Sequence, residues 1–267
     1  MSAPPIARYV ALGDSSTEGL DDPDGAGGYR GWADRFAERI ARHQGELAYA
    51  NLAIRGRCAR QIKDEQLAPA LALRPALATV VAGMNDLLRG GFDARAIAAD
   101  IGEMQRAIVD GGGIVISFTL PDIAARLAIG PLARRLSQRT EALNAEIRAV
   151  SASTGARLLD LASYPLATDP RLWSRDRLHA NRDGHARIAA GLAQLLGLPD
   201  TDDGWLAPLP DLPAPPLRDR LGEHAAWARD YFAPWLWRRA RGRTAGDDRR
   251  AKRPTLTPII AAPVAAE

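Results

Sequence analysis

Residues 8–16 read RYVALGDSS, a short apolar run that ends in a glycine followed by polar residues. Apolar residues at consecutive positions are typical of a strand in a parallel sheet, because helices cover both faces of such a sheet. The polar residues that follow the strand then lie at the carboxyl edge of the sheet, where α/β proteins bind their ligands. This stretch therefore predicts an α/β fold and places Ser15 at its ligand-binding edge.

The rest of the first 198 residues repeats this pattern of a short apolar run followed by a longer amphipathic segment. The strand candidates are 8–13, 47–53, 78–83, 113–119 and 156–161, and the helix candidates are 29–43, 60–72, 93–110, 131–153 and 183–197. Alternating strands and helices require crossover connections, which put helices on both faces of a parallel sheet. We therefore expect residues 1–198 to form one doubly wound α/β domain.

The composition changes after residue 198. Residues 199–216 are rich in proline and aspartate and follow neither a helical nor a strand period, as is typical of an extended linker. An amphipathic helix is expected over 217–241, with Pro234 interrupting or kinking it. Residues 242–267 are basic and rich in alanine and proline, and they are expected to be disordered.

The charge distribution excludes one class of partner. Hydrophobic residues make up 46% and charged residues 25% of the 267 residues, which is ordinary for a globular protein. The net charge is +3, but residues 238–253 alone hold eight basic and two acidic side chains. The rest of the chain is therefore net acidic, and we expect no nucleic-acid partner.

The first residues and the cysteine count bear on the compartment. The N-terminus has no basic stretch followed by an apolar run, so no secretory signal peptide is predicted. No apolar stretch approaches the ~20 residues that span a bilayer. Cys58 is the only cysteine, so an internal disulfide cannot form. These features predict a cytoplasmic protein.

Residues that can carry chemistry follow the strand candidates at four places. They are Gly13-Asp14-Ser15, Gly56, Gly83-Met84-Asn85-Asp86 and Asp176-Arg177-Leu178-His179. A serine at a strand end can act as a nucleophile, and glycine N–H groups and asparagine amides suit an oxyanion hole. An aspartate three residues before a histidine can reach its Nδ1 from the same turn. Each pattern alone is more often a turn or a helix cap, so the prediction depends on finding all four in this order.

The four blocks together resemble the SGNH hydrolases, also called GDSL esterases and lipases. The Gly-Asp-Ser-Ser-Thr-Glu-Gly opening and the Arg-Leu-His ending are similar to those of actinobacterial members, although Ser16 stands where the name-giving motif has leucine. The resemblance implies a flavodoxin-like three-layer α/β/α sandwich with a five-stranded parallel sheet. It also implies a serine esterase that hydrolyses a small-molecule carboxylic ester, with either a short or a lipid-like acyl group, through an acyl-enzyme and needs no cofactor.

The same resemblance implies a role for each motif residue. Ser15 would be the nucleophile, His179 the general base and acid, and Asp176 the carboxylate that orients the histidine. The oxyanion hole would consist of the Ser15 and Gly56 N–H groups and the Asn85 side chain.

Three further residues are candidates for the substrate pocket. Leu172 and Trp173 come just before Asp176, and Cys58 lies two residues after Gly56. The alternative for Trp173 is packing of its own loop, and a lone cysteine is usually a small apolar filler. His185, close to His179 and Asp176, raises the question of a metal site, but no third and fourth ligand group is evident, so no metal is predicted.

Two rivals to the enzyme hypothesis remain. One is a binding module of the same fold that has lost turnover. The other is a membrane-surface protein that works through its C-terminal segment, because tryptophans beside arginines suit a membrane interface. Trp227, Trp235 and Trp237 stand just before the arginine-rich run. We favour instead a helix that packs these aromatic residues on the domain, because the segment is short and Pro234 interrupts it.

Overall fold

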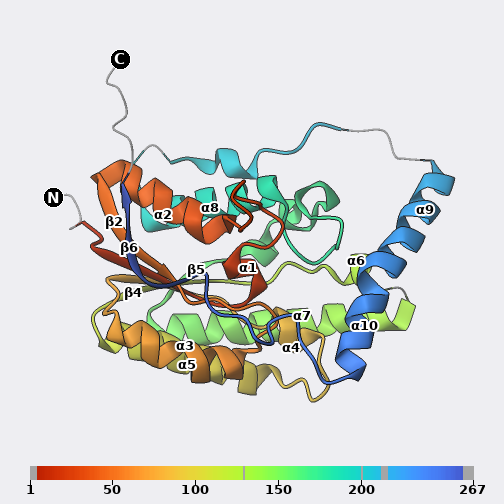
Figure 1. Cartoon of the computed structure of the whole chain (residues 1–267), viewed down its shortest axis with the longest axis horizontal. Coiled ribbons are helices and arrows are strands. Elements are labelled where there is room, and N and C mark those ends of the chain that lie inside the picture. Colours follow the sequence, from red (N-terminus) through yellow and green to blue (C-terminus); the bar gives the residue numbers. More distant parts are fainter. Residues whose placement is uncertain (1–4, 129, 200, 212–215, 261–267) are drawn as a thin grey trace.

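The computed structural model describes residues 5–128, 130–199, 201–211 and 216–260. Their sheet has six strands in the order β5-β4-β3-β1-β2-β6 (Figure 1). The strands are β1 (Arg8–Leu12), β2 (Glu46–Asn51), β3 (Leu77–Val80), β4 (Ile114–Phe118), β5 (Arg157–Leu159) and β6 (Arg253–Ile260). The first five are parallel and follow the flavodoxin-like order, whereas β6 is antiparallel to β2. The predicted fold class is confirmed.

Helices cover both faces of the sheet. α2 (Gly31–Gln44) and α8 (Arg182–Leu196) lie on one face, and α3 (Ala59–Ala72), α5 (Ala94–Asp110) and α7 (Gly130–Thr154) lie on the other (Figure 1). These five helices begin and end within two residues of their predicted bounds. Single-turn elements carry no periodic signal and were not predicted. They are α1 (Ser15–Glu18), α4 (Met84–Leu87), α6 (Ala124–Leu127) and the 3₁₀ turns η1 (Leu161–Ser163), η2 (Pro165–Thr168), η3 (Pro170–Leu172) and η4 (Asp203–Leu206).

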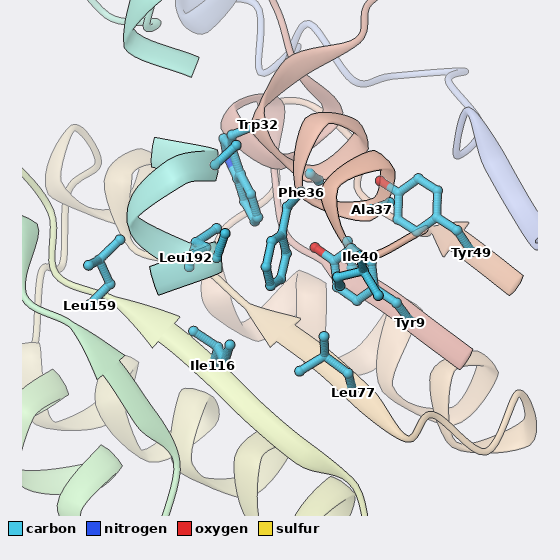
Figure 2. Packing of buried hydrophobic residues seen from close by; sticks show 14 of the residues in the cluster. Tyr9, Trp32, Phe36, Ala37, Ile40, Tyr49, Leu77, Ile116, Leu159 and Leu192 are labelled. Atoms are coloured by element: carbon cyan, nitrogen blue, oxygen red, sulfur yellow. The ribbon is translucent and has the colours of Figure 1, made fainter. Parts of the chain in front are cut away.

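The layer under α2 shows why this helix forms where it does. Trp32, Phe36 and Ile40 recur every four residues and point together onto the sheet (Figure 2). All three are fully buried, and the Trp32 ring meets Phe118 of β4 edge-on with 5.3 Å between centroids. Burying such side chains stabilises a fold by about 1.5–3 kcal/mol each. This layer therefore gives the carboxyl edge of the sheet a rigid support.

The predicted disorder of 242–267 is wrong for residues 253–260, which form the edge strand β6. Pro254 and Pro258 hid the strand in the sequence, yet proline is tolerated at a sheet edge, where one side needs no ladder partner. A partly buried cation fixes the strand at its start, because Lys252 Nζ donates to the Tyr29 and Arg30 carbonyls at 2.8 and 2.9 Å. Residues 242–252 form turns, and residues 261–267 lie outside the described residues.

The expected linker 199–216 is partly folded onto the domain. Trp205 in η4 is buried and packs edge-to-face against Tyr164. Its Nε1–H donates to Gln194 at 2.6 Å. The α/β domain therefore extends beyond residue 198 and includes both Trp205 and β6. Residues 212–215 lie outside the described residues.

The expected helix 217–241 is present but interrupted. It consists of α9 (Leu217–Trp227), a π-helical turn η5 (Ala228–Phe232) and α10 (Ala233–Ala240), which stand at one end of the molecule (Figure 1). The wide turn comes just before Pro234, which cannot donate a backbone hydrogen bond to the preceding turn. Across the described part of the chain, no helix combines the length and the apolar character that crossing a bilayer requires.

Candidate active site

Ser15 is the first residue of α1, directly after β1 and next to the point where the strand order reverses between β1 and β3. Gly13 leaves no room for a side chain, because a Cβ there would lie 2.1 Å from Thr17 Oγ1. Gln66 holds the Gly13 backbone by accepting from its N–H and donating to its carbonyl, both at 2.9 Å. Asp14 caps α1 by accepting the Ser16 N–H at 3.0 Å. The backbone around Ser15 is therefore fixed from several sides.

The structure brings Ser15, His179 and Asp176 into one chain of hydrogen bonds. His179 Nδ1 lies 2.5 Å from Asp176 Oδ2, and Nε2 lies 2.7 Å from Ser15 Oγ. An ionised carboxylate only accepts hydrogen bonds, so Nδ1 carries the proton and Nε2 is left to accept the serine hydroxyl. The turn is shaped by the aspartate itself, whose Oδ1 accepts the Leu178 and His179 N–H groups at 2.9 and 3.0 Å.

The charges around the hydrogen-bonded residues favour the protonated form of His179. Burial alone would lower the pKa of His179, but its hydrogen bond and charge interaction with Asp176 raise the pKa above the ordinary 6.5. Burial alone would likewise raise the pKa of Asp176, but its bonds to His179 hold that pKa well below the usual range. The pair therefore stabilises an imidazolium beside Ser15.

Two residues beside these hydrogen-bonded side chains could not be predicted from the sequence. Asp21, in the loop after α1, has its Oδ2 3.9 Å from His179 Nδ1 and contributes to the raised pKa of the histidine. The Ser174 hydroxyl contacts both Asp21 and Asp176, lying 2.6 Å from Asp176 Oδ1. Asp21 stands 153 residues before Ser174, so only the folded chain brings the two carboxylates together.

The three predicted oxyanion donors belong to one connected region. Within the described residues, the Ser15 and Gly56 N–H groups donate to no other protein group. Asn85 Nδ2 donates to Asp14 Oδ2 at 2.9 Å and to the Arg57 carbonyl at 3.1 Å, which ties the Ser15, Gly56 and Asn85 blocks together. Both amide hydrogens of Asn85 are thus directed at protein acceptors. Burial raises the pKa of the accepting Asp14 to about 6.

Gly56 occupies a backbone conformation that requires glycine. Its φ is +79°, a left-handed region that side chains disfavour. The adjoining Arg55 is held by Glu18 of α1, which accepts the Arg55 N–H at 2.9 Å and pairs with its guanidinium. Thr244 of the C-terminal segment covers the loop, lying 3.3 Å from where a Gly56 Cβ would be.

The three pocket candidates do not lie together. Leu172 and Trp173 both line a small apolar cavity of about 40 Å³ that also includes Ala180, the neighbour of His179. Cys58 lies elsewhere, at the start of α3, and burial raises the pKa of its thiol to about 12. A thiol with so high a pKa stays protonated, which agrees with the alternative of an apolar filler.

His185 stabilises the loop that follows α1. Its Nδ1 accepts the Trp32 N–H at 3.1 Å and its Nε2–H donates to the Leu20 carbonyl at 2.9 Å. Burial lowers its pKa to about 4, so it stays neutral. His185 therefore holds the loop that carries Asp21.

Asp21, Asp176 and His179 also offer three atoms within 4.8 Å of one another that could bind a metal ion. However, His179 Nδ1 and Asp176 Oδ2 are only 2.5 Å apart. Two ligands about 2 Å from a tetrahedral ion lie more than about 3 Å from each other, so this spacing fits a shared proton better than a metal.

Comparison with known proteins assigns the family. Residues 11–187 match the GDSL-like Lipase/Acylhydrolase family, and the chain belongs to this family. It is therefore a hydrolase of the GDSL type, as its four sequence blocks predicted. None of the curated proteins compared with the chain matches it.

Solved structures of esterases share the fold. The psychrotrophic esterase EstA from Pseudoalteromonas, solved with monoethylphosphonate as inhibitor, is 16% identical and covers 71% of this chain and 96% of its own, with a TM-score of 0.57. A lipase/acylhydrolase from Enterococcus faecalis is 21% identical, with coverage of 71% and 94% and a TM-score of 0.56. A catalytic mutant of the acetylxylan esterase Axe2 from Geobacillus stearothermophilus is 16% identical, with coverage of 76% and 97% and a TM-score of 0.59.

Proposed function

We propose that this protein hydrolyses carboxylic esters through an acyl-enzyme formed on Ser15. The observation that carries the proposal is the unbroken chain from Ser15 Oγ through His179 to Asp176, with distances of 2.7 and 2.5 Å. Nucleophile, base and orienting carboxylate within hydrogen-bond reach are the requirements for activating a serine. That EstA is inhibited by a phosphonate agrees with this chemistry.

In the first half-reaction, Ser15 Oγ attacks the ester carbonyl carbon while His179 Nε2 takes the hydroxyl proton. The carbonyl electron pair moves onto oxygen, and Asp176 stabilises the imidazolium that results. Collapse of this intermediate breaks the ester C–O bond, and the departing alcohol receives its proton from His179. In the second half-reaction, water takes the place of the serine hydroxyl and the acid is released, which regenerates Ser15.

The developing oxyanion would be bound by the Ser15 and Gly56 N–H groups, whose hydrogens no described protein group accepts. Asn85 would complete the hole by sharing one amide hydrogen now donated to Asp14 or Arg57. Asp14 is the positioning residue in this scheme, because its carboxylate fixes the orientation of the Asn85 amide.

A fluorophosphonate probe tests the proposal directly. Intact-protein mass spectrometry should find one adduct on the wild type, located by peptide mapping on Ser15, and none on Ser15→Ala. The Ser16→Ala variant is a matched control, because its hydroxyl lies one residue away and should leave labelling unchanged. Absence of labelling in the wild type would favour the rival binding module that has lost turnover.

A further inference from the structure

The aromatic part of the C-terminal helix has an unusual composition. Residues 231–243 read YFAPWLWRRARGR, which combines four aromatic residues, one leucine and four arginines with no acidic residue. These residues lie outside the family match, which ends at residue 187. We call the helical segment 217–240, formed by α9, η5 and α10, the C-terminal arm.

The π-helical turn brings three aromatic rings of the arm together on one face. Phe232 stacks on Trp227, five residues earlier, with 5.5 Å between ring centroids, and on Trp235 with 5.9 Å. In an uninterrupted α-helix only residues three or four apart lie on the same face, so the wide turn is what aligns Trp227 with Phe232.

Phe232 and three neighbouring apolar side chains of the arm are exposed to solvent. The described residues include six exposed large apolar side chains, and four of these lie in one seven-residue stretch of the arm. They are Tyr231, Phe232, Leu236 and Trp237, with exposed fractions of 40%, 39%, 49% and 61%. Trp227 contacts the domain through Asp176 and Arg177, whereas these four side chains are exposed. Such a cluster of apolar groups marks an interaction surface.

The positive charge next to these apolar side chains indicates which kind of partner binds here. The arginines at 238, 239, 241 and 243 follow the aromatic residues directly, and Arg241 lies over the Trp237 ring at 4.2 Å. Aromatic side chains suit the headgroup level of a bilayer, and arginines beside them attract anionic headgroups. A second copy of the chain, joined symmetrically through the same face, would instead bring two arginine runs together.

The arm is also attached to the catalytic turn. Trp227 Nε1–H donates to the Asp176 carbonyl at 2.9 Å, and the Arg177 guanidinium lies over the Trp227 ring at 4.7 Å. Arg177 also contacts His224 of α9 at 2.7 Å. A surface bound by the arm would therefore lie beside the Asp176–His179 turn.

We propose that the exposed apolar side chains and the arginines of residues 231–243 bind an anionic phospholipid surface. The observations that carry this are the four exposed apolar side chains and the adjoining arginines at 238, 239 and 241. Arg243, the last arginine of the run, lies 3.9 Å from both Asp247 and Asp248. Binding places the catalytic turn at the lipid surface, where amphiphilic or membrane-dissolved esters collect. Lipid binding does not depend on the acyl-enzyme chemistry, so the Ser15→Ala variant should bind lipid like the wild type.

Vesicle co-sedimentation of the full chain tests this proposal. We expect binding to phosphatidylcholine vesicles that contain phosphatidylglycerol, weak binding to phosphatidylcholine alone, and weaker binding as salt increases. Each arginine near an anionic surface contributes about a fivefold factor, so Arg238→Gln with Arg241→Gln should weaken binding roughly 25-fold. Trp237→Ala with Leu236→Ala should weaken it at least about fivefold.

The matched control is Ile260→Ala, which removes an exposed apolar side chain (75% exposed) at the far end of β6. It should leave binding unchanged, and all the arm variants should hydrolyse soluble p-nitrophenyl acetate like the wild type. Equal binding to neutral and anionic vesicles, or binding that the arm variants leave intact, would overturn the proposal. So would a dimer in sedimentation velocity that Trp237→Ala dissociates, since that result assigns the face to a second copy.

Discussion

Two regions of the molecule are held in place in different ways. One is the turn that carries Asp176 and His179, and the other is the C-terminal segment 217–260. The turn closes on itself, because Asp176 accepts two backbone N–H groups within three residues of its own position. The C-terminal segment is held mainly by distant partners, with Trp227 on the Asp176 carbonyl, Lys252 on Asp34 and β6 on β2. Local contacts produce a spacing that a sequence displays, whereas distant contacts leave no such pattern.

The largest effect that this comparison predicts is at Ser15. Ser15→Ala should lower kcat/KM for p-nitrophenyl acetate by at least about 10³-fold, with residual activity from the oxyanion donors. Because the three residues act as a unit, adding His179→Ala should cause little further loss. A folded Ser15→Ala variant with near-normal turnover would refute the assignment of Ser15 as the nucleophile.

A second prediction tests the neighbouring loops, which connect through Asn85. Asn85→Ala should lower kcat roughly 10²–10³-fold, because it removes the amide whose hydrogen, now shared with Asp14 or Arg57, we propose to stabilise the oxyanion. Asp14→Asn keeps an acceptor for the Asn85 amide and should have a smaller effect. If Asn85→Ala changes KM alone, its amide serves ground-state binding and is not part of the oxyanion hole.

The third prediction tests the distant contacts of the C-terminal segment. Lys252 Nζ lies 3.0 Å from Asp34 Oδ1, and both side chains are largely buried. Lys252→Met leaves that carboxylate without its cationic partner, although the Tyr49 hydroxyl still donates to it at 2.7 Å. We therefore expect a loss of about 2–3 kcal/mol and a melting temperature roughly 4–10 °C lower.

Activity at low temperature should survive Lys252→Met, because every proposed catalytic residue precedes residue 180. Arg250→Met, which removes an exposed positive charge two positions away, is the control and should leave the melting temperature nearly unchanged. An equal loss in both variants would mean that charge alone, and not the buried contact, holds the segment.

The same contrast explains what could be predicted from the sequence. The five parallel strands and the five long helices are apolar runs and amphipathic periods, so they were found within a few residues. The edge strand β6 was missed because Pro254 and Pro258 break the pattern of a strand and its partner β2 lies some 200 residues earlier.

The candidate site divides in the same way. Ser15, His179 and Asp176 stand in recognisable local motifs, and the structure brings them together in one chain of hydrogen bonds. Asp21 and Ser174 stand in no motif, since they act only through proximity across 153 residues. That Asn85 directs its hydrogens at Asp14 and Arg57 was equally invisible, because a motif specifies a residue type and not its partners.

The smallest expected effect concerns Asp21, the distant contact nearest the chemistry. His179 must be neutral to act as a base, so kcat/KM should rise as pH increases through its pKa, which lies above 6.5. Burial alone lowers that pKa, whereas the carboxylates of Asp176, Asp21 and Asp14 raise it. Asp21→Asn removes one of these charges 3.9 Å from Nδ1 and should move the rising limb to lower pH.

The size of this shift should be modest, because Asp21 is 37% exposed and solvent screens its charge. We expect roughly half a unit to one unit, with kcat near its wild-type value on the plateau. Asp183→Asn is the matched control, since it removes an exposed carboxylate from the first turn of α8 and should leave the limb in place. A shift to higher pH, or an equal shift in both variants, would show that Asp21 does not act on His179. A fall in plateau kcat without a shift would instead assign Asp21 to holding the loop through Ser174.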